Sequence, residues 1–401
     1  MKNYIFILMA TIMVAMTGFY GCKPEITDPV GNGTAMNPFK VATVADLKRV
    51  ASGEQGPGGT WAKDKHYKQV ADINLSSVSN WTPLSSNSFF SGTYDGGGYT
   101  ISNLTINKSG ISVYDDTGSG LFLNVSGTVA NVRLLNVNIT AATGMGSVAS
   151  NVRNGGTIHH CSVHNLALSA SSDLAGGVAG TISLGGTVSN CMTIGGTIGN
   201  NNSTLGTVGG IAGTNSGMIK NCYSTVNIKG NGIWYGGLVG YTSGMVQYCY
   251  ATGDVTSQSS IGHPNGGIAG NTFGANTSKI YNCVALNREV KRTSAPSINT
   301  LGRITGSITG SGSNIADMST NYARSDMKLS NNTTTFTIPA SEISLTSIHG
   351  ANVVAADYNG NNSDTWWKGT AKFPSSEWDF AKNRLPHLKG FDGLVQTPVV
   401  N

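Results

Sequence analysis

One run of residue types in the sequence could hold a metal ion, His159-His160-Cys161 followed by His164. Imidazole and thiolate are ligands that zinc prefers, and a zinc site needs four of them that converge on one point. Successive side chains of a strand point to opposite faces, so His159 and Cys161 would share one face and His160 and His164 the other. No second cluster in the sequence supplies the missing ligands. We therefore predict solvent-facing histidines and no metal site.

Acidic residues are too sparse for acid–base catalysis. Between residues 141 and 310 the only carboxylates are Asp173, Asp254 and Glu289, which belong to different parts of the chain. Glycosidases place two carboxylates in one groove, and polysaccharide lyases combine carboxylates with Arg or Lys. The sequence also lacks the His-Glu-x-x-His motif of zinc peptidases. It therefore predicts no catalytic residues, no cofactor and no enzymatic activity.

Aromatic side chains are the remaining candidates for a binding site. Trp234, Tyr241 and Tyr248 fall near predicted turns, and Trp366-Trp367 form a pair close to the C-terminus. A flat aromatic ring offers a large apolar face that suits the C–H surface of a sugar. We predict these five residues as ligand-binding candidates, and structural packing is the alternative for each.

The elements that would position these residues come from a repeat of about 30 residues. The unit reads G-G-(I/L/V)-(A/V)-G, a polar turn, and then (I/V)-x-N-C; its clearest copy is YGGLVGYTSGMVQYCYATGDV at 235–255. The cysteine recurs at intervals of 30, 31, 27 and 34 residues, at positions 161, 191, 222, 249 and 283. Apolar runs within each unit are short and alternating, which is typical of strands. The repeat predicts coils of a three-sided parallel β-solenoid.

Stacking of such coils explains the unusual composition, with 54 glycines and only 11% charged residues. A charged motif position would face its own copy in the next coil, and like charges at that spacing are destabilising. Asparagine recurs before the cysteine, and we expect a ladder of turns there in which His160 and Tyr248 substitute. The five repeat cysteines predict a buried ladder of free thiols, with disulfides between coils as the alternative.

The first 21 residues read as a targeting segment. Lys2 precedes an apolar stretch over 4–16, and Gly21 stands directly before Cys22. This pattern predicts a lipoprotein signal peptide over 1–21 with Cys22 as the lipidated N-terminus, whereas an uncleaved anchor and ordinary secretion are the alternatives. Residues 22–37 contain proline and glycine and read as a tether.

The remaining chain divides into three parts. Residues 38–80 are predicted to form an N-terminal cap, in which Thr43 and Asp46 match a capping box at a helix start. Residues 81–310 hold the solenoid, and 311–401 lose the repeat and are expected to form C-terminal coils and a small cap subdomain.

The repeated units resemble the GLUG motif, which Gly237-Leu238-Val239-Gly240 and the following QYCYATGDV match best. The flanking segments 65–76, 81–106, 120–134 and 378–388 are similar to the flanks of the same family. The resemblance implies an all-β, right-handed parallel β-helix on a surface lipoprotein of the adhesin kind.

We interpret the chain as a lipid-anchored adhesin that recognises a glycan or a host or matrix protein at its cell surface. A β-helix carbohydrate-active enzyme and a structural envelope component remain as alternatives. We expect an outer-membrane lipoprotein of a bacterial envelope, monomeric, that contacts the membrane only through its lipid. The net charge is +5, and no segment is dense in Lys or Arg, so we expect no nucleic-acid partner.

Overall fold

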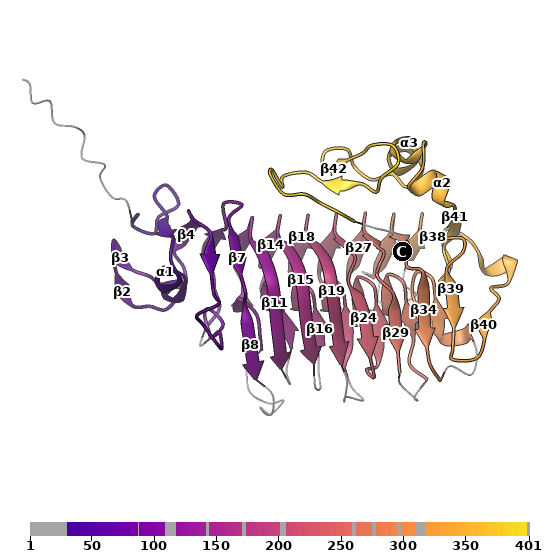
Figure 1. The fold of residues 1–401 in the computed structure, drawn as a ribbon, viewed down its shortest axis with the longest axis horizontal. Helices are drawn as coiled ribbons and strands as arrows, with labels where there is room; N and C mark the ends of the chain where they lie inside the picture. The colour runs from indigo at the N-terminus through magenta and orange to yellow at the C-terminus, as the bar shows by residue number, and fades with distance from the viewer. Residues whose placement is uncertain are drawn as a thin grey trace, which may run out of the picture.

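The computed structural model is a rod of parallel strands with a separate C-terminal segment lying along its side (Figure 1). It describes residues 30–86, 88–108, 118–141, 144–170, 174–200, 206–258, 262–274, 278–294, 298–309 and 317–398. The predicted signal peptide and Cys22 lie outside the described residues. None of the described helices is long and apolar enough to span a membrane. The all-β parallel solenoid predicted from the repeat is confirmed.

One coil shows how the repeat folds. The segment from 207 to 230 forms β20 (Thr207–Gly209), β21 (Ala212–Asn215), β22 (Met218–Lys220), β23 (Tyr223–Ser224) and β24 (Asn227–Gly230). Each strand pairs in parallel with its counterpart in the next coil, in sheets of six, seven, ten and sixteen strands. Four sheets replace the predicted three sides, because the Gly-Gly turn between β20 and β21 divides one side into two.

The strands stack in the same order in every wall. The six-stranded sheet contains β20 and β12 (Met145–Gly146), β16 (Leu174–Gly176), β25 (Trp234–Gly236), β30 (Asn265–Gly266) and β35 (Leu301–Gly302). The seven-stranded sheet contains β21 and β9 (Phe122–Val125), β13 (Ala149–Val152), β17 (Ala179–Ile182), β26 (Val239–Thr242), β31 (Ala269–Phe273) and β36 (Ile308–Thr309). The ten-stranded sheet contains β22 and β1 (Phe39–Val41), β4 (His66–Gln69), β6 (Thr93–Asp95), β10 (Thr128–Ala130), β14 (Thr157–His159), β18 (Thr187–Ser189), β27 (Met245–Gln247), β32 (Lys279–Tyr281) and β37 (Asp317–Ser319).

The sixteen-stranded sheet is the widest wall. It contains β23, β24, β5 (Ile73–Asn74), β7 (Thr100–Ser102), β8 (Thr105–Lys108), β11 (Arg133–Ala141), β15 (Ser162–Ala170), β19 (Met192–Asn200), β28 (Tyr250–Ala251), β29 (Val255–Ser257), β33 (Val284–Ala285), β34 (Glu289–Arg292), β38 (Tyr322–Arg324), β39 (Lys328–Ser330), β40 (Thr335–Phe336) and β41 (Ala351–Val353). The short elements outside the four walls are α1 (Val44–Arg49), β2 (Gln55–Gly56), β3 (Gly59–Thr60), two 3₁₀ turns (Ile298–Thr300 and Ala340–Glu342), α2 (Ala355–Tyr358), α3 (Ser363–Thr365), a π-helical turn (Trp366–Thr370), β42 (Trp378–Asp379) and β43 (His387–Leu388).

The corner before each repeat cysteine, and before Val132 in the preceding coil, has a left-handed backbone, which confirms the predicted ladder of turns. We call these residues the corner ladder; their φ values lie between 51° and 56° at Asn131, His160, Asn190, Asn221, Tyr248 and Asn282. Left-handed φ is costly for residues with a Cβ, and asparagine tolerates it better than most. The ladder therefore turns six successive coils from the ten-stranded into the sixteen-stranded sheet.

The second glycine of the Gly-Gly turn allows close approach between coils. A Cβ at Gly177 would collide with the carbonyl oxygen of Gly210, and a Cβ at Gly210 would collide with that of Gly237. In the last coil Arg303 occupies this register, since β30 pairs with β35 just before it. Its side chain is 1% exposed and donates to the carbonyl oxygens of His349 and Gly350, both at 2.9 Å. Arg303 therefore closes the C-terminal end of the rod.

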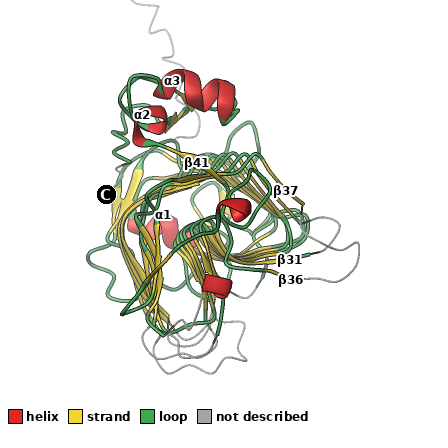
Figure 2. Ribbon diagram, turned by 90° about the vertical axis from the view of Figure 1, so that its right-hand side faces the viewer, coloured by secondary structure: helices red, strands yellow, loops and turns green. Residues whose placement is uncertain are grey.

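The interior of the rod and its N-terminal end confirm two predictions made from the sequence. The five repeat cysteines are buried and free, so the predicted thiol ladder is confirmed. At the start of α1, Asp46 N donates to Thr43 Oγ1 at 3.1 Å and Thr43 N donates to Asp46 Oδ2 at 3.1 Å, which is the predicted capping box. Leu47 of α1 is buried against the first strands, and Figure 2 shows α1 within the outline of the stacked coils.

The first testable prediction concerns the corner ladder. Asn221 is 2% exposed with φ of 51°, and a β-branched residue is an outlier at such φ. We expect Asn221→Val to lower the free energy of unfolding by about 1–3 kcal/mol, measured by urea denaturation. Asn221→Gly, which accepts positive φ, is the matched control, and equal losses in both variants would contradict the role of the backbone at this corner.

Candidate functional site

After β41 the chain leaves the rod and folds back along its outside. We call residues 354–398 the strap; it contains α2, α3, β42 and β43 (Figure 1). The end-on view places α2 and α3 outside the wall of stacked strands (Figure 2). The strap reaches far toward the N-terminal coils, since Arg133 Nη2 donates to the carbonyl oxygen of Asp392 at 2.7 Å.

The strap covers an apolar row on the outer face of the sixteen-stranded sheet. We call this row the outer stripe; it consists of Met192, Tyr223, Tyr250 and Val284, which are partners on successive strands. The rings of Tyr223 and Tyr250 stack at 4.8 Å with an interplanar angle of 4°. Burial raises the pKa of both tyrosines well above its usual range.

Three aromatic residues of the strap pack directly on or around the outer stripe. Trp378 lies 6.3 Å from the ring of Tyr223 and 5.6 Å from that of Tyr250. Trp367 lies 5.6 Å from Tyr250, and Phe373 packs against both tryptophans. The phenol of Tyr250 donates to the carbonyl oxygen of Pro386 at 2.9 Å, which satisfies its buried hydroxyl. The strap and the stripe therefore form a second hydrophobic core outside the rod.

The corner ladder also binds the strap. Asn190 Nδ2 donates to Glu377 Oε2 at 2.5 Å, and Asn282 Nδ2 donates to the carbonyl oxygen of Ala371 at 3.1 Å.

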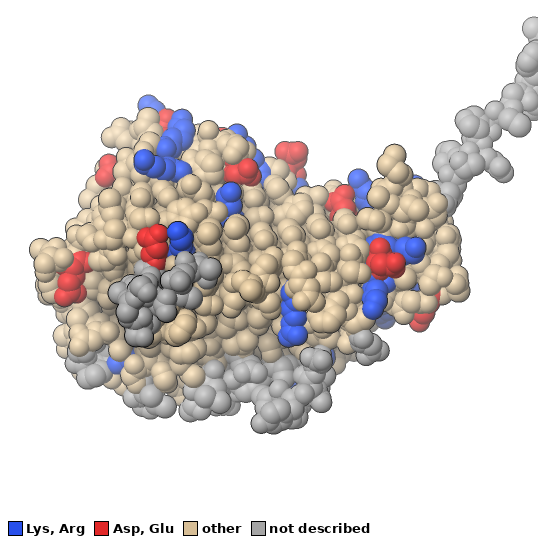
Figure 3. Space-filling view, turned by 180° about the vertical axis from the view of Figure 1, so that it is seen from behind, with Lys and Arg blue, Asp and Glu red and all other residues tan. Residues whose placement is uncertain are grey.

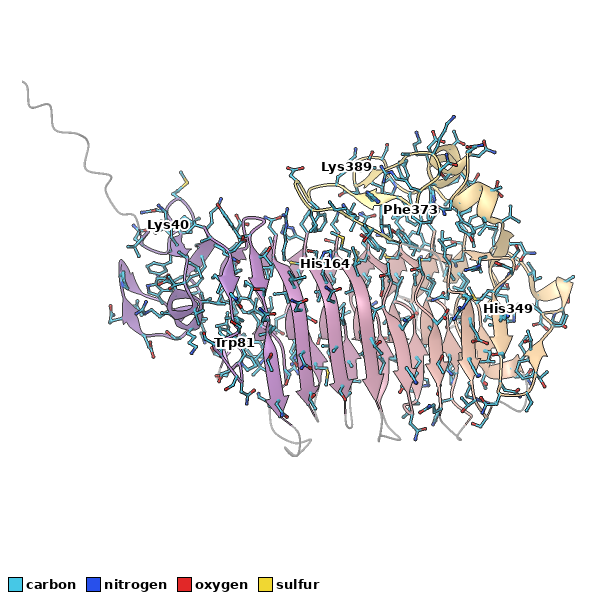
Figure 4. The ribbon with its side chains drawn as sticks, in the orientation of Figure 1. Lys40, Trp81, His164, His349, Phe373 and Lys389 are labelled. Atoms are coloured by element: carbon cyan, nitrogen blue, oxygen red, sulfur yellow. The ribbon has the colours of Figure 1, made fainter. Side chains whose placement is uncertain are left out.

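The two ladder positions that are not asparagine pack against phenylalanines of the strap instead. The ring of His160 lies 6.2 Å from that of Phe391, and the ring of Tyr248 lies 6.3 Å from that of Phe373. Figure 4 shows Phe373 in the strap above the rod. Two of the asparagines and both substituted positions of the ladder therefore contact the strap.

This packing corrects the predicted ligand-binding residues. Trp367 is 1% exposed and its indole donates to the carbonyl oxygen of Tyr358 at 2.8 Å, so the prediction that it binds a ligand is wrong. Trp366 is half-buried against Tyr322 and Trp367. Tyr248 is half-buried against the strap, as described above. For these three residues the structure favours packing, the alternative that the sequence left open.

Trp234 and Tyr241 remain on a surface outside the strap. Their rings stack at 4.9 Å, and the ring of Phe273 lies 6.4 Å from that of Tyr241. Trp234 and Tyr241 are half-buried and Phe273 is 44% exposed. We call these three residues the aromatic strip; it lies on β25, β26 and β31. Sequence reasoning missed Phe273, although its place one coil after Tyr241 is a signal that could have identified it.

The histidine run is only partly solvent-facing, because the strap and the neighbouring coils cover part of it. His159 and His160 are half-buried, with 3.0 Å between their Nδ1 atoms. Burial lowers the pKa of both imidazoles, and also that of His164. Among the described residues no group of three or more His, Cys, Asp or Glu side chains could hold a metal ion.

Comparisons with known proteins agree with the repeat and the fold. The model of the GLUG motif matches residues 204–229 and 235–256, which confirms the GLUG repeats. Halomucin of Haloquadratum walsbyi is 30% identical over 168 residues, which are 38% of this chain and 2% of halomucin. The chain thus spans only a small fraction of that relative. The motif and the fold are consistent with a cell-surface protein.

A solved structure shares the whole architecture. The crystal structure of a "putative immunoglobulin A1 protease" from Bacteroides ovatus has a TM-score of 0.60 and 22% identity. The match covers 90% of this chain and 94% of the other.

This likeness contradicts the prediction that the chain has no enzymatic activity. A protein with the same fold over nearly its full length is named as a protease, so the lack of a familiar catalytic motif here does not exclude catalysis. The likeness itself establishes the fold and assigns no catalytic residue.

The second prediction concerns the strap. Trp378 is 1% exposed at the centre of the second core, and removing a buried tryptophan costs about 3–5 kcal/mol. We expect Trp378→Ala to open the strap locally, so that limited proteolysis cuts within 354–398 while the rod stays intact. Trp234→Ala, on another surface, is the control and should be cleaved like the unmodified chain. Simultaneous loss of rod and strap would show that the two do not unfold separately.

The third prediction concerns pH. Burial and the neighbouring Arg384 lower the pKa of His387 in β43 to about 4, against the opposing effect of its strand partner Asp379. A histidine held neutral in the fold takes up a proton more readily when released, so its contribution is complete above pH about 6.5 and is lost as pH falls toward 4. Tryptophan fluorescence should report strap opening in that window. His387→Gln should reduce the pH dependence, and an unchanged profile would contradict this assignment.

Proposed function

We propose that this chain is a cell-surface binding protein of the adhesin type, and that the aromatic strip contacts its ligand. The ligand class that fits is a glycan or an extracellular protein. The observation that carries the proposal is the partly exposed group in which Trp234 stacks on Tyr241 and Phe273 lies 6.4 Å from Tyr241, on a side that the strap leaves open. Neighbouring aromatic rings on a rigid wall offer a ready-made apolar surface, since little side-chain entropy is lost on binding.

The rod architecture supports this proposal. Parallel coils give a stiff body, and the charge-poor surface in Figure 3 is broken only by scattered charged residues. We infer attachment through a lipid on Cys22 at the N-terminal end, with the monomeric rod extending from an outer membrane. Contact with the membrane would then be limited to the lipid, with no nucleic-acid partner.

A second candidate function is enzymatic. It is favoured by the fold shared with the structure named as a putative immunoglobulin A1 protease. Incubation of the chain with immunoglobulin A1, and separately with neutral and acidic polysaccharides, tests this candidate. New fragments in either reaction would establish catalysis, and intact substrates in all of them would contradict the enzymatic candidate.

The fourth prediction tests the aromatic strip. Truncating a well-placed aromatic residue in an interface costs more than about 1 kcal/mol. We expect Trp234→Ala, Tyr241→Ala and Phe273→Ala each to weaken binding about tenfold, measured with glycan and matrix-protein arrays on the chain from residue 23. Phe89→Ala, which alters a 38% exposed aromatic residue elsewhere, is the control. No binding on either array, or binding that survives all three substitutions, would contradict the proposal.

A further inference from the structure

A polar cleft lies where the tip of the strap meets the N-terminal coils. Its volume is about 390 Å³, and its lining includes Lys68, Asp95, Asn131, Arg133 and His160 of the rod together with Gly390, Phe391 and Asp392 of the strap. Figure 4 places Lys40 at the N-terminal end of the rod, Lys389 on the strap and His164 on the wall below. We propose that this cleft binds a sugar residue that carries a carboxylate. It is separate from the aromatic strip and does not rest on the role proposed for it.

Arg133 provides the cation for the carboxylate. Within the described part of the chain, the only hydrogen bond of its side chain is from Nη2 to the backbone oxygen of Asp392, and the guanidinium forms no ion pair. A guanidinium has five N–H donors in a planar fork that matches the two oxygens of a carboxylate. Because the carbonyl oxygen of Asp392 is neutral and accepts a single hydrogen bond, the positive charge of Arg133 and most of its N–H donors remain available to a ligand.

The carboxylate already present in the cleft does not neutralise Arg133. Asp95 Oδ1 accepts hydrogen bonds from Asn131 Nδ2 at 2.8 Å and Gly97 N at 2.9 Å. Its other oxygen, Oδ2, lies 3.6 Å from Lys68 Nζ. Asp95 is therefore held by groups of its own wall, and Asp392, which also lines the cleft, is exposed to solvent.

A pair of stacked lysines adds positive charge beside the cleft. Lys40 and Lys68 are direct partners on β1 and β4, so two like charges face each other on adjacent strands. Such a pair is destabilising, and the composition of the rest of the chain avoids it. Elsewhere in its described part, the rod avoids stacking like charges on adjacent strands. The Lys40–Lys68 pair departs from this rule, which points to a functional use.

The remaining groups suit a sugar rather than a small inorganic anion. Asn131 Oδ1 is an acceptor in the same cleft as the donors of Lys68 and Arg133, and sugar hydroxyl groups both donate and accept. The rings of His160 and Phe391, 6.2 Å apart, provide the apolar side. The volume lies in the range of small-molecule sites. Since rod and strap both line the cleft, a bound sugar would join them.

Isothermal titration of the chain from residue 23 tests the proposal with three probes of equal length. These are a uronate oligosaccharide, its carboxyl-reduced neutral counterpart, and a sulfated neutral oligosaccharide. We expect the uronate alone to bind, with an affinity that falls as salt is raised. Arg133→Gln should weaken this binding at least tenfold, and Lys68→Gln severalfold. Phe89→Ala, which alters an exposed aromatic residue outside both the cleft and the aromatic strip, is the control and should bind the uronate unchanged.

Arg133→Gln also removes a strap contact, so tryptophan fluorescence should verify that the strap of this variant stays closed. Among the described residues the side chain of Lys68 forms an ion pair with Asp95 of the rod and no hydrogen bond or ion pair with the strap. The Lys68 variant therefore keeps the proposal falsifiable if Arg133→Gln opens the strap. Three results would overturn the proposal. They are equal binding of the neutral probe, binding of the sulfated probe alone, and uronate binding that is absent or unaffected by both substitutions.

Discussion

The structure depends on one constraint, that every side chain of a coil lies directly over its counterpart in the next coil. Adjacent parallel strands are about 4.8 Å apart, so each register position becomes a column of similar residues. Charged columns would repel, and charged residues accordingly make up only 11% of the chain. The same spacing selects glycine where a Cβ would strike the next carbonyl oxygen, as at Gly177 and Gly210, and asparagine where the backbone must turn left-handed.

Stacking acts on the outside of the rod as well as on its core. It aligns Tyr223 with Tyr250 in a stripe too apolar to face water, and the strap is the element that covers it. The strap is therefore part of the fold, although its two strands, β42 and β43, lie outside the four walls. Its docking leaves two surfaces of different chemistry, the aromatic strip on one side and the polar cleft at the strap tip on the other.

The repeat was sufficient to predict the parallel coils, the corner ladder and the thiol ladder, because these follow from the spacing of identical residues. It did not predict that Trp367 and His160 pack within or against the strap, because their burial depends on the path of the chain after residue 353. That path has no repeat to reveal it and is determined by contacts between residues as distant in sequence as Arg133 and Asp392. The polar cleft could not be predicted from the sequence for the same reason. Lys68, Asp95 and Arg133 belong to different coils and come together only when the coils stack.

Hydrogen exchange followed by mass spectrometry on the chain from residue 23 tests the account most directly. If stacking holds the coils and a separate core holds the strap, the amides of β20 to β34 should exchange slowly together. Those of the strap, residues 354–398, should form a second group that exchanges faster and at a uniform rate. A strap that exchanges with the coils as one unit, or coils that exchange faster than the strap, would contradict the account.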